Sequence, residues 1–218
     1  MSRQDWLRAR QKGIGGSEAA AIIGLSKYSS PLKVYLDKTT PITDETPDIQ
    51  SEAMRQGKDL EEYCASRFEE ATGKKVRRVN AIVQHPKYDF LIANLDRRVD
   101  GENSILECKT TKPYTEAAKA FEVGNVPPEY AIQCHHYMLV TGADKCYLAA
   151  VVLGMGFHVI EIDRDQEVLD LLLEREIEFW EKCVKAGTPP EWDGSEAASE
   201  ILKERYPEVQ KGAEVELK

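Results

Sequence analysis

Three residues in the middle of the chain, Asp96, Glu107 and Lys109, have types and a spacing that suit a hydrolytic metal site. Residues 100–103 read Asp-Gly-Glu-Asn, which predicts a two-residue turn between two strands. Pairing across that turn places Asp96 directly opposite Glu107. Lys109 lies two residues beyond Glu107, so its side chain leaves the same face of the strand. The sequence therefore predicts two acids and a lysine on one face of a hairpin.

Two opposed carboxylates need something to neutralise them. Like charges directly opposite each other destabilise a sheet by roughly 0.2–1 kcal/mol, and burial among apolar neighbours raises that cost. A shared proton, a basic residue or a metal ion would relieve it. Carboxylates are hard ligands suited to Mg²⁺ or Mn²⁺, and a lysine beside the metal can orient or deprotonate a water for phosphodiester hydrolysis. The alternative is a surface ion pair between Glu107 and Lys109.

The elements that must position these residues follow from periodicity, caps and turn signals. Their order predicts helices, a three-strand meander, helices, two strands and further helices, hence one mixed α/β domain with a central sheet. We expect a single domain over residues 1–218, with a mobile loop at 39–50 and a C-terminal helical extension at 187–218. Helices are expected at about 2–11, 18–23, 32–37, 52–72, 115–123, 127–141, 166–186 and 195–205, and strands at 75–84, 90–99, 104–110, 146–153 and 157–162.

Composition excludes several classes of protein. The chain has 218 residues, 42% hydrophobic and 31% charged, which is typical of a folded globular protein. No apolar run is long enough to cross a membrane, and no secretory signal is visible. Five scattered cysteines predict reduced thiols and a cytoplasmic location. The net charge is −9, yet residues 71–120 hold ten Lys or Arg against six Asp or Glu. This basic middle could give one binding face.

Five segments, in this order, resemble the YqaJ-type viral recombinase family, the family of phage lambda exonuclease, within the PD-(D/E)xK nuclease superfamily. They are WLRARQKGIGGSEAAAIIGLSKYSSPLKVYLDK, RQGKDLEEYCASRFEEATGKKV, ANLDRRV, ILECKTTKPY and PPEYAIQCHHYMLVTG. The resemblance implies a restriction-endonuclease-like α/β fold, with a central mixed sheet flanked by helices.

The resemblance also implies roles for individual residues. Asp96 and Glu107 match the metal-binding acids, and the carbonyl of Cys108 would supply a third ligand. Lys109 matches the catalytic lysine. Glu61 matches a helix glutamate that approaches the metal and takes part in catalysis. The alternative for Glu61 is a solvated helix carboxylate.

Further matches concern catalysis and DNA. Gln133 matches an active-site glutamine that holds a phosphate. Arg10 and Ser17 match an arginine and a serine that contact a DNA 5′-phosphate, and an ordinary helix cap with a surface arginine is the alternative. Ser17 is expected to cap the helix that follows it. Asn94 stands where the family has a phosphate-pocket serine, and Arg97 is expected to contact the DNA backbone.

The sequence departs from the family pattern next to Asp96. Leu95 stands in place of the proline of the superfamily name, and Arg97 and Arg98 follow Asp96 where many relatives have glycine. These changes leave the acidic residues and Lys109 intact, but they alter the part of the pattern on which the expected preference for a DNA 5′-phosphate depends.

The combined pattern predicts a Mg²⁺- or Mn²⁺-dependent deoxyribonuclease. The expected activity is exonucleolytic digestion of linear double-stranded DNA, 5′ to 3′, in phage or prophage recombination. The resemblance further implies a single-strand annealing protein as partner and a trimeric ring. The alternatives are an endonuclease of the same fold and a catalytically silent DNA-binding protein.

Overall fold

The strongest helix signals of the sequence coincide with helix boundaries in the computed structural model, which describes residues 3–43 and 51–191. Gly73 and Gly142 end two long helices in the left-handed conformation, with φ of 72° and 69°. The Ser30 side chain accepts a hydrogen bond from the amide of Lys33 and so caps the helix that Pro31 begins. The expected helix at 195–205 and most of the loop at 39–50 lie outside the described residues.

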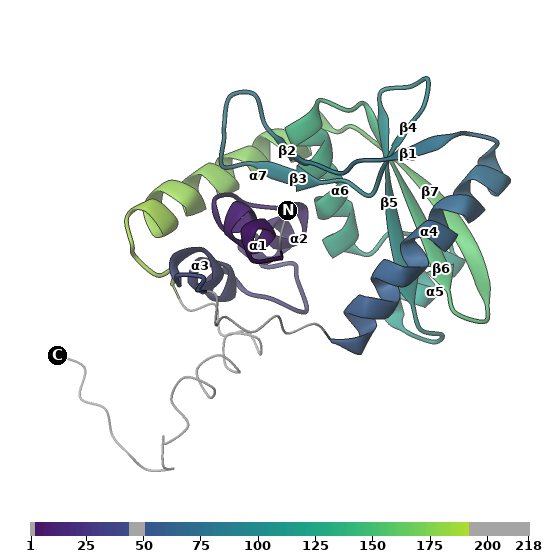
Figure 1. Cartoon of the computed structure of the whole chain (residues 1–218), viewed down its shortest axis with the longest axis horizontal. Helices are drawn as coiled ribbons and strands as arrows, with labels where there is room; N and C mark the ends of the chain where they lie inside the picture. Colours follow the sequence, from purple (N-terminus) through teal and green to yellow (C-terminus); the bar gives the residue numbers. More distant parts are fainter. Residues whose placement is uncertain (1–2, 44–50, 192–218) are drawn as a thin grey trace, which may run out of the picture.

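Seven α-helices and one π-helical turn occur within the described residues (Figure 1). They are α1 (Arg3–Gln11), α2 (Gly16–Ile22), α3 (Pro31–Thr39), α4 (Glu52–Thr72), α5 (Glu116–Glu122), α6 (Pro128–Thr141), α7 (Gln166–Phe179) and η1 (Trp180–Lys185). The strands are β1 (Val76–Arg78), β2 (Ile82–Gln84), β3 (Ile92–Asn94), β4 (Arg97–Val99), β5 (Ser104–Thr111), β6 (Lys145–Val152) and β7 (Gly156–Asp163).

The central sheet has five strands in the order β1-β4-β5-β6-β7. Only β5 and β6 run parallel, joined by a crossover that contains α5 and α6; the other three pairings are antiparallel. The expected register around the 100–103 turn is confirmed, because Arg97 pairs with Leu106 and Arg98 with Ile105. The fold is thus mixed α/β with a central, mostly antiparallel sheet flanked by helices.

The expected three-strand meander is wrong in one respect. The segments 75–84 and 90–99 are not continuous strands, because each divides into two. The first half of 75–84, β1, pairs with the second half of 90–99, β4, in the central sheet, whereas β2 and β3 form a sheet of their own. The chain breaks its strand conformation at Leu95 and Asp96, where Leu95 is buried in the core. Asp96 there uses its side chain, rather than its backbone, to bind β5.

Helices cover both faces of the central sheet. On one face, α4 buries Cys64, Ala65 and Phe68 against residues of β4, β5 and β6. On the other face lies α6, which is buried from Gln133 to Val140 and contacts α2, α7 and β3 as well as the sheet. Figure 1 shows α6 between the sheet and the group formed by α1, α2, α3 and α7.

Ser17 does not cap α2 as expected. The helix begins one residue earlier, at Gly16, with Gly15 as its N-cap. The amide of Gly15 instead donates to Oε2 of Glu18 at 2.7 Å. The hydroxyl of Ser17 is thereby left for other contacts within the first turn.

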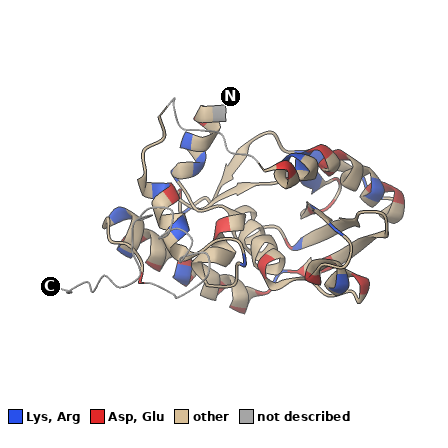
Figure 2. Cartoon of the chain, turned by 90° about the horizontal axis from the view of Figure 1, so that it is seen from below, with Lys and Arg blue, Asp and Glu red and all other residues tan. Residues whose placement is uncertain are grey.

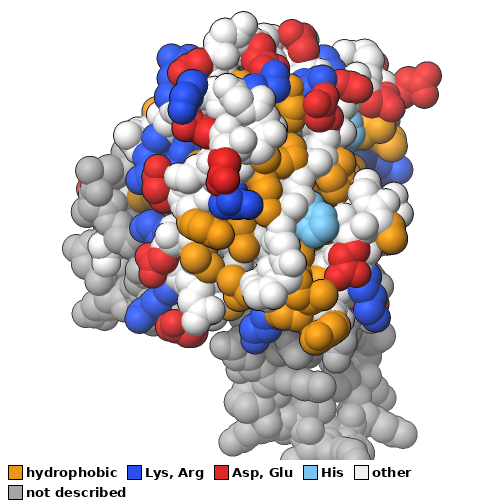
Figure 3. Space-filling model, turned by 90° about the vertical axis from the view of Figure 1, so that its right-hand side faces the viewer, with side chains coloured by type: hydrophobic (Ala, Val, Ile, Leu, Met, Phe, Trp, Pro, Cys, Tyr) orange, Lys and Arg blue, Asp and Glu red, His pale blue; other side chains and the backbone are white. Residues whose placement is uncertain are grey.

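The surface carries charges of both signs. Figure 2 shows acidic and basic residues interspersed along the helices. The face seen in Figure 3 has hydrophobic side chains between charged ones. No helix among the described residues is long and apolar enough to cross a membrane.

Candidate active site

The two predicted acids lie side by side at the start of the site. Oδ2 of Asp96 accepts a hydrogen bond from the amide of Cys108 at 2.8 Å, which fixes Asp96 against β5 one residue beyond Glu107. Glu107 is only 4% exposed. Because the N–H and C=O of one strand residue point to the same side, the carbonyl of Cys108 faces the side on which Asp96 lies. The structure thus brings Asp96, Glu107 and the Cys108 carbonyl together, as the sequence predicted.

Lys109 and Gln133 complete a closed hydrogen-bonded set with Glu107. Nζ of Lys109 donates to Oε1 of Glu107 at 2.7 Å and to Oε1 of Gln133 at 2.8 Å. Nε2 of Gln133 donates to the same Glu107 oxygen at 2.7 Å and lies 2.9 Å from the hydroxyl of Tyr137. All the bonds to Glu107 end on Oε1, which orients the carboxylate.

Oε2 of Glu107 is the unsatisfied atom of this set. It is buried and has no hydrogen-bond partner among the described residues. A buried charged oxygen without a partner is costly, and a metal ion is one group that would satisfy it. The donor chemistry fits Mg²⁺ or Mn²⁺, because two carboxylates and a main-chain oxygen are hard ligands.

The electrostatics of the site favour binding of a cation. Burial raises the pKa of Asp96 well above its ordinary value, and the neighbouring charge of Glu107 raises it further. Burial by itself lowers the pKa of Lys109, but the carboxylates of Glu107 and Asp96 outweigh this effect and raise the pKa. Lys109 is therefore a cation at neutral pH, and one lysine faces two acids.

Glu61 has a different partner in the structure. Nη1 of Arg97 binds Oε1 of Glu61 and donates to the carbonyl of Asp96 at 2.7 Å, while Nη2 donates to Glu62 at 2.9 Å. Arg97, expected at the DNA surface, is only 2% exposed. Among the described residues, no three His, Cys, Asp or Glu side chains form a group that could hold a metal. A metal here would rely on Asp96, Glu107, main-chain oxygen and water, a common ligand set for Mg²⁺.

A cleft of about 860 Å³ joins the site to the N-terminal helices. Lys109 and Gln133 line one part of it, and Arg10 and Ser17 line another. Nη2 of Arg10 lies 3.5 Å from Oγ of Ser17. Two predicted groups that are distant in sequence therefore share one cavity. Asn94, at the end of β3, is not among the described residues that line it.

The chain matches a known protein family over most of its length. The YqaJ-like viral recombinase domain matches residues 5–144, which is more than half of the chain. The chain belongs to this family. The matched range contains all the residues of the site just described, from Arg10 to Gln133.

Similar proteins extend the family match over the rest of the chain. The uncharacterized protein YqaJ of Bacillus subtilis (strain 168) is 45% identical over 219 residues, which is 100% of this chain and 67% of that protein. The alkaline exonuclease LHK-Exo from Laribacter hongkongensis has a TM-score of 0.69 at 20% identity, with 94% of this chain and 99% of that chain covered. A phage-related exonuclease from Haemophilus somnus 129PT has a TM-score of 0.56 at 16% identity, covering 80% and 96%. The two solved structures support the fold.

The candidate site contains contacts that the sequence did not predict. Nζ of Lys109 lies 4.7 Å from the ring centre of Tyr130, a cation–π contact that adds a second restraint on the lysine. Tyr130 is three residues before Gln133, so helical spacing could have placed both on one face. Lys38 is buried and donates to Glu18 at 2.7 Å and to the carbonyl of Arg10 at 2.9 Å. That pair comes from two helices, and no local pattern in the sequence indicates it.

Proposed function

We propose that this chain is a Mg²⁺- or Mn²⁺-dependent nuclease that digests linear double-stranded DNA from its ends, 5′ to 3′, in phage or prophage recombination. The observation that carries the proposal is the buried, unpartnered Oε2 of Glu107 beside Asp96, close to a lysine that lines a cleft. Family membership and the fold shared with two exonucleases support it.

In this mechanism Asp96, Glu107 and the carbonyl of Cys108 would hold the divalent ion. The ion, when bound, would activate a water and neutralise charge on the phosphate. The bonds from Lys109 and Gln133 end on Oε1 of Glu107, so Oε2 is the oxygen with which Glu107 would hold the ion. Asp96 is held in place by the Cys108 amide, so the two carboxylates are positioned before the ion binds.

Lys109 and Gln133 act on the DNA side of the site. The Lys109 ammonium orients the attacking water and stabilises negative charge that develops on the phosphate. Gln133 positions Lys109 through its amide oxygen and places the scissile phosphate. Both side chains line the cleft, which gives DNA access to them.

Arg10 and Ser17, which line the same cleft as Lys109 and Gln133, would bind the terminal 5′-phosphate. Arginine offers a fork of N–H donors that matches phosphate oxygens. Nη2 of Arg10 lies 3.6 Å from Oε1 of Glu18, a carboxylate that Lys38 holds. A phosphate would compete with Glu18 for Arg10. Asn94, two residues before Asp96, is the remaining candidate contact for DNA.

We further propose that the chain works as a trimeric ring, with a single-strand annealing protein as partner, in the host cytoplasm. A ring would enclose DNA during successive cleavages. Light scattering on the purified protein tests the trimer, and co-purification with an annealing protein encoded beside it tests the partner.

A digestion assay tests the proposed activity. Purified protein is incubated with Mg²⁺ or Mn²⁺ and linear duplexes, with and without a 5′-phosphate, and with covalently closed circles. We expect loss of linear DNA only, faster with the phosphate. Cleavage of circles would instead indicate an endonuclease. A gel shift without cleavage in either metal would indicate a binding protein.

A further inference from the structure

Arg97 connects the helix α4 to the strand that follows Asp96. Its guanidinium binds Glu61 and Glu62 on α4 and the carbonyl of Asp96. Only 3% of its side chain is exposed, against 24% for Glu61 and 71% for Glu62. Glu61 is thus the partner that shares the buried environment of Arg97.

An arginine in this position constrains Glu61. The guanidinium stays charged at any pH at which the protein folds, and a buried charge that loses its partner destabilises a protein strongly. Glu62 is a weaker partner, because it is exposed and is also bound by Arg78 at 3.1 Å. Arg97 therefore retains Glu61 unless another anion replaces it.

The backbone reinforces this arrangement. Arg97 lies on an internal strand of the central sheet, paired with Arg78 on one side and Leu106 on the other. Pairing on both sides fixes the backbone from which its side chain extends to α4. The same Nη1 atom of Arg97 binds Oε1 of Glu61 and the carbonyl of Asp96, so Glu61 lies close to a residue of the proposed metal site.

We propose that the permanent positive charge of Arg97 neutralises the Glu61 carboxylate and thereby prevents Glu61 from acting as a ligand of the metal. The divalent ion is then bound by Asp96, Glu107 and the Cys108 carbonyl, with water in the remaining positions. This inference rests on the proposed metal site. It assigns Arg97 a positioning role inside the protein in place of a DNA contact.

Binding of Mn²⁺ to the metal-stripped full chain, without DNA, tests the inference by electron paramagnetic resonance. Arg97→Met should bind Mn²⁺ about tenfold more tightly or better, because Glu61 becomes free to join the ion. The Arg97→Met/Glu61→Gln double variant should return to within roughly threefold of the unmodified protein, because the deleted pair carries no net charge and supplies no ligand.

The matched control is Arg78→Met. Arg78 lies 3.1 Å from Glu62 and 3.9 Å from Glu61, but half of its side chain is exposed. Its removal should change Mn²⁺ affinity less than about threefold, since exposed charges are screened. Circular dichroism checks that each variant is folded. If Arg97→Met does not fold, Arg97→Gln replaces it and should shift affinity in the same direction.

Two results would overturn the inference while leaving the metal site in place. One is a double variant that binds Mn²⁺ tenfold or more weakly than the unmodified protein, since Glu61 would then be a ligand despite Arg97. The other is an unchanged affinity in Arg97→Met. The Asp96→Asn variant distinguishes a failure of the proposed role of Arg97 from a failure of the proposed metal site. If Asp96→Asn leaves Mn²⁺ binding intact, the proposed metal site itself is wrong, and the inference with it.

Discussion

Two buried groups of charged side chains involve residues of α6, and they differ in charge balance and in access to the cleft. One is the site cluster, defined as Asp96, Glu107, Lys109 and Gln133. The other is the pair His136–Glu176, in which Nδ1 of His136 lies 2.7 Å from Oε1 of Glu176. Both contain a buried carboxylate oxygen without a hydrogen-bond partner in the described part of the chain. That feature alone therefore does not identify a functional site.

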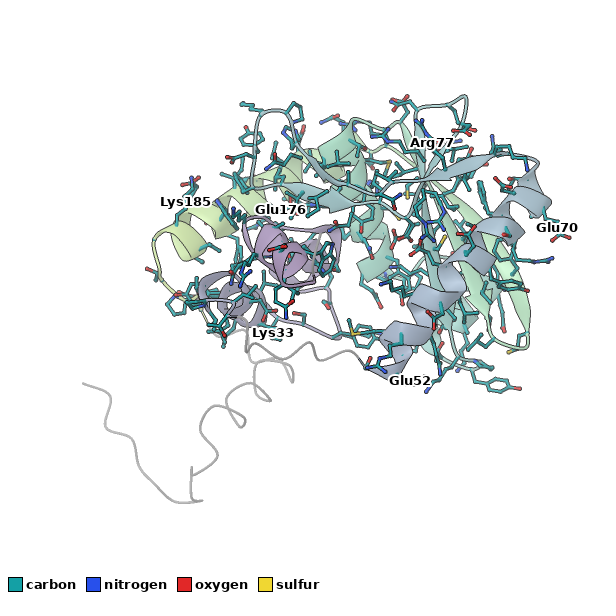
Figure 4. All side chains as sticks on the ribbon, viewed as in Figure 1. Lys33, Glu52, Glu70, Arg77, Glu176 and Lys185 are labelled. Atoms are coloured by element: carbon teal, nitrogen blue, oxygen red, sulfur yellow. The ribbon has the colours of Figure 1, made fainter. Side chains whose placement is uncertain are left out.

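The His136–Glu176 pair is buried away from solvent, and its two opposite charges balance each other. His136 and Glu176 are both 0% exposed, and Nε2 of His136 lies 2.9 Å from the carbonyl of Ile92. Burial by itself lowers the pKa of His136, but Glu176 and the Ile92 carbonyl outweigh it and raise the pKa. The pair ties α6 and α7 to β3, and Figure 4 shows Glu176 on the inner side of α7.

The site cluster is unbalanced and open. Two acids face one lysine, and Lys109 and Gln133 reach the cleft. A balanced pair without access stabilises the fold, whereas an excess of buried negative charge beside a cavity calls for a cation. We therefore assign chemistry to the site cluster and a structural role to the His136–Glu176 pair.

The largest effect should come from Lys109→Ala. Loss of the ammonium that orients water and stabilises charge should lower the cleavage rate by about 10²–10⁴-fold, measured on linear DNA. The exposed Lys112, which is not among the described cleft residues, gives the control variant Lys112→Ala, expected to stay near full activity. A fully active Lys109→Ala protein would contradict the proposed role of Lys109 in catalysis.

Breaking the closed pair should act on stability instead. Glu176→Ala leaves a buried histidine without its counter-ion and should lower the free energy of unfolding by about 3–5 kcal/mol, measured by urea denaturation. The double variant His136→Leu/Glu176→Met removes both charges and should recover most of that loss. Equal losses in the single and double variants would show that the charges do not interact as described.

The packing between α2 and α6 offers a third test. A Cβ at Gly16 would lie 2.5 Å from the ring of Tyr137 and 3.0 Å from Cγ of Gln133. Gly16→Ala should therefore displace Gln133, lower cleavage and destabilise the protein by about 1–3 kcal/mol. Gly57→Ala, on the open surface of α4, should stabilise by about 0.5–1 kcal/mol. A Gly16→Ala variant with unchanged cleavage and unchanged stability would show that α2 does not pack closely against Gln133 and Tyr137.

Asp96→Asn should have a smaller effect on the free energy of unfolding, and this substitution should stabilise the protein. The amide oxygen can still accept the Cys108 amide, while the repulsion with Glu107 is removed. In metal-free buffer we expect about 1 kcal/mol of stabilisation, which corresponds to roughly 2–4 °C in Tm. Mn²⁺ should raise the Tm of the unmodified protein and not that of the variant. A lower Tm for Asp96→Asn without metal would contradict the opposed-carboxylate geometry.

The smallest expected effect is a pH dependence of the closed pair. A histidine whose folded pKa is raised contributes stability that is complete below its unfolded pKa of about 6.5 and is lost as pH rises through the folded value. The difference in unfolding free energy between the unmodified protein and the His136→Leu/Glu176→Met variant should therefore shrink as pH rises above about 6.5. A difference that is constant across this range would indicate a neutral His136.

Local signals explain what the sequence could predict. The turn at residues 100–103 set the register that brings Asp96 to Glu107, and glycines marked the ends of α4 and α6. The family resemblance added Gln133, and the structure places it on Glu107. These features depend on a few neighbouring residues or on a motif.

Features that depend on distant partners escaped prediction. The division of the meander depends on how Leu95 packs into the core and how Asp96 binds Cys108. His136 and Glu176 are 40 residues apart and come together only through helix packing. The burial of Arg97 under α4 likewise follows from tertiary contacts, since alternation along β4 gives no sign of its glutamate partners.

Anomalous diffraction from crystals grown with Mn²⁺ would locate the divalent ion. We expect one strong peak within about 2.5 Å of Oε2 of Glu107, a carboxylate oxygen of Asp96 and the Cys108 carbonyl. A peak elsewhere, or no peak at this position in a preparation that cleaves DNA with Mn²⁺, would contradict it.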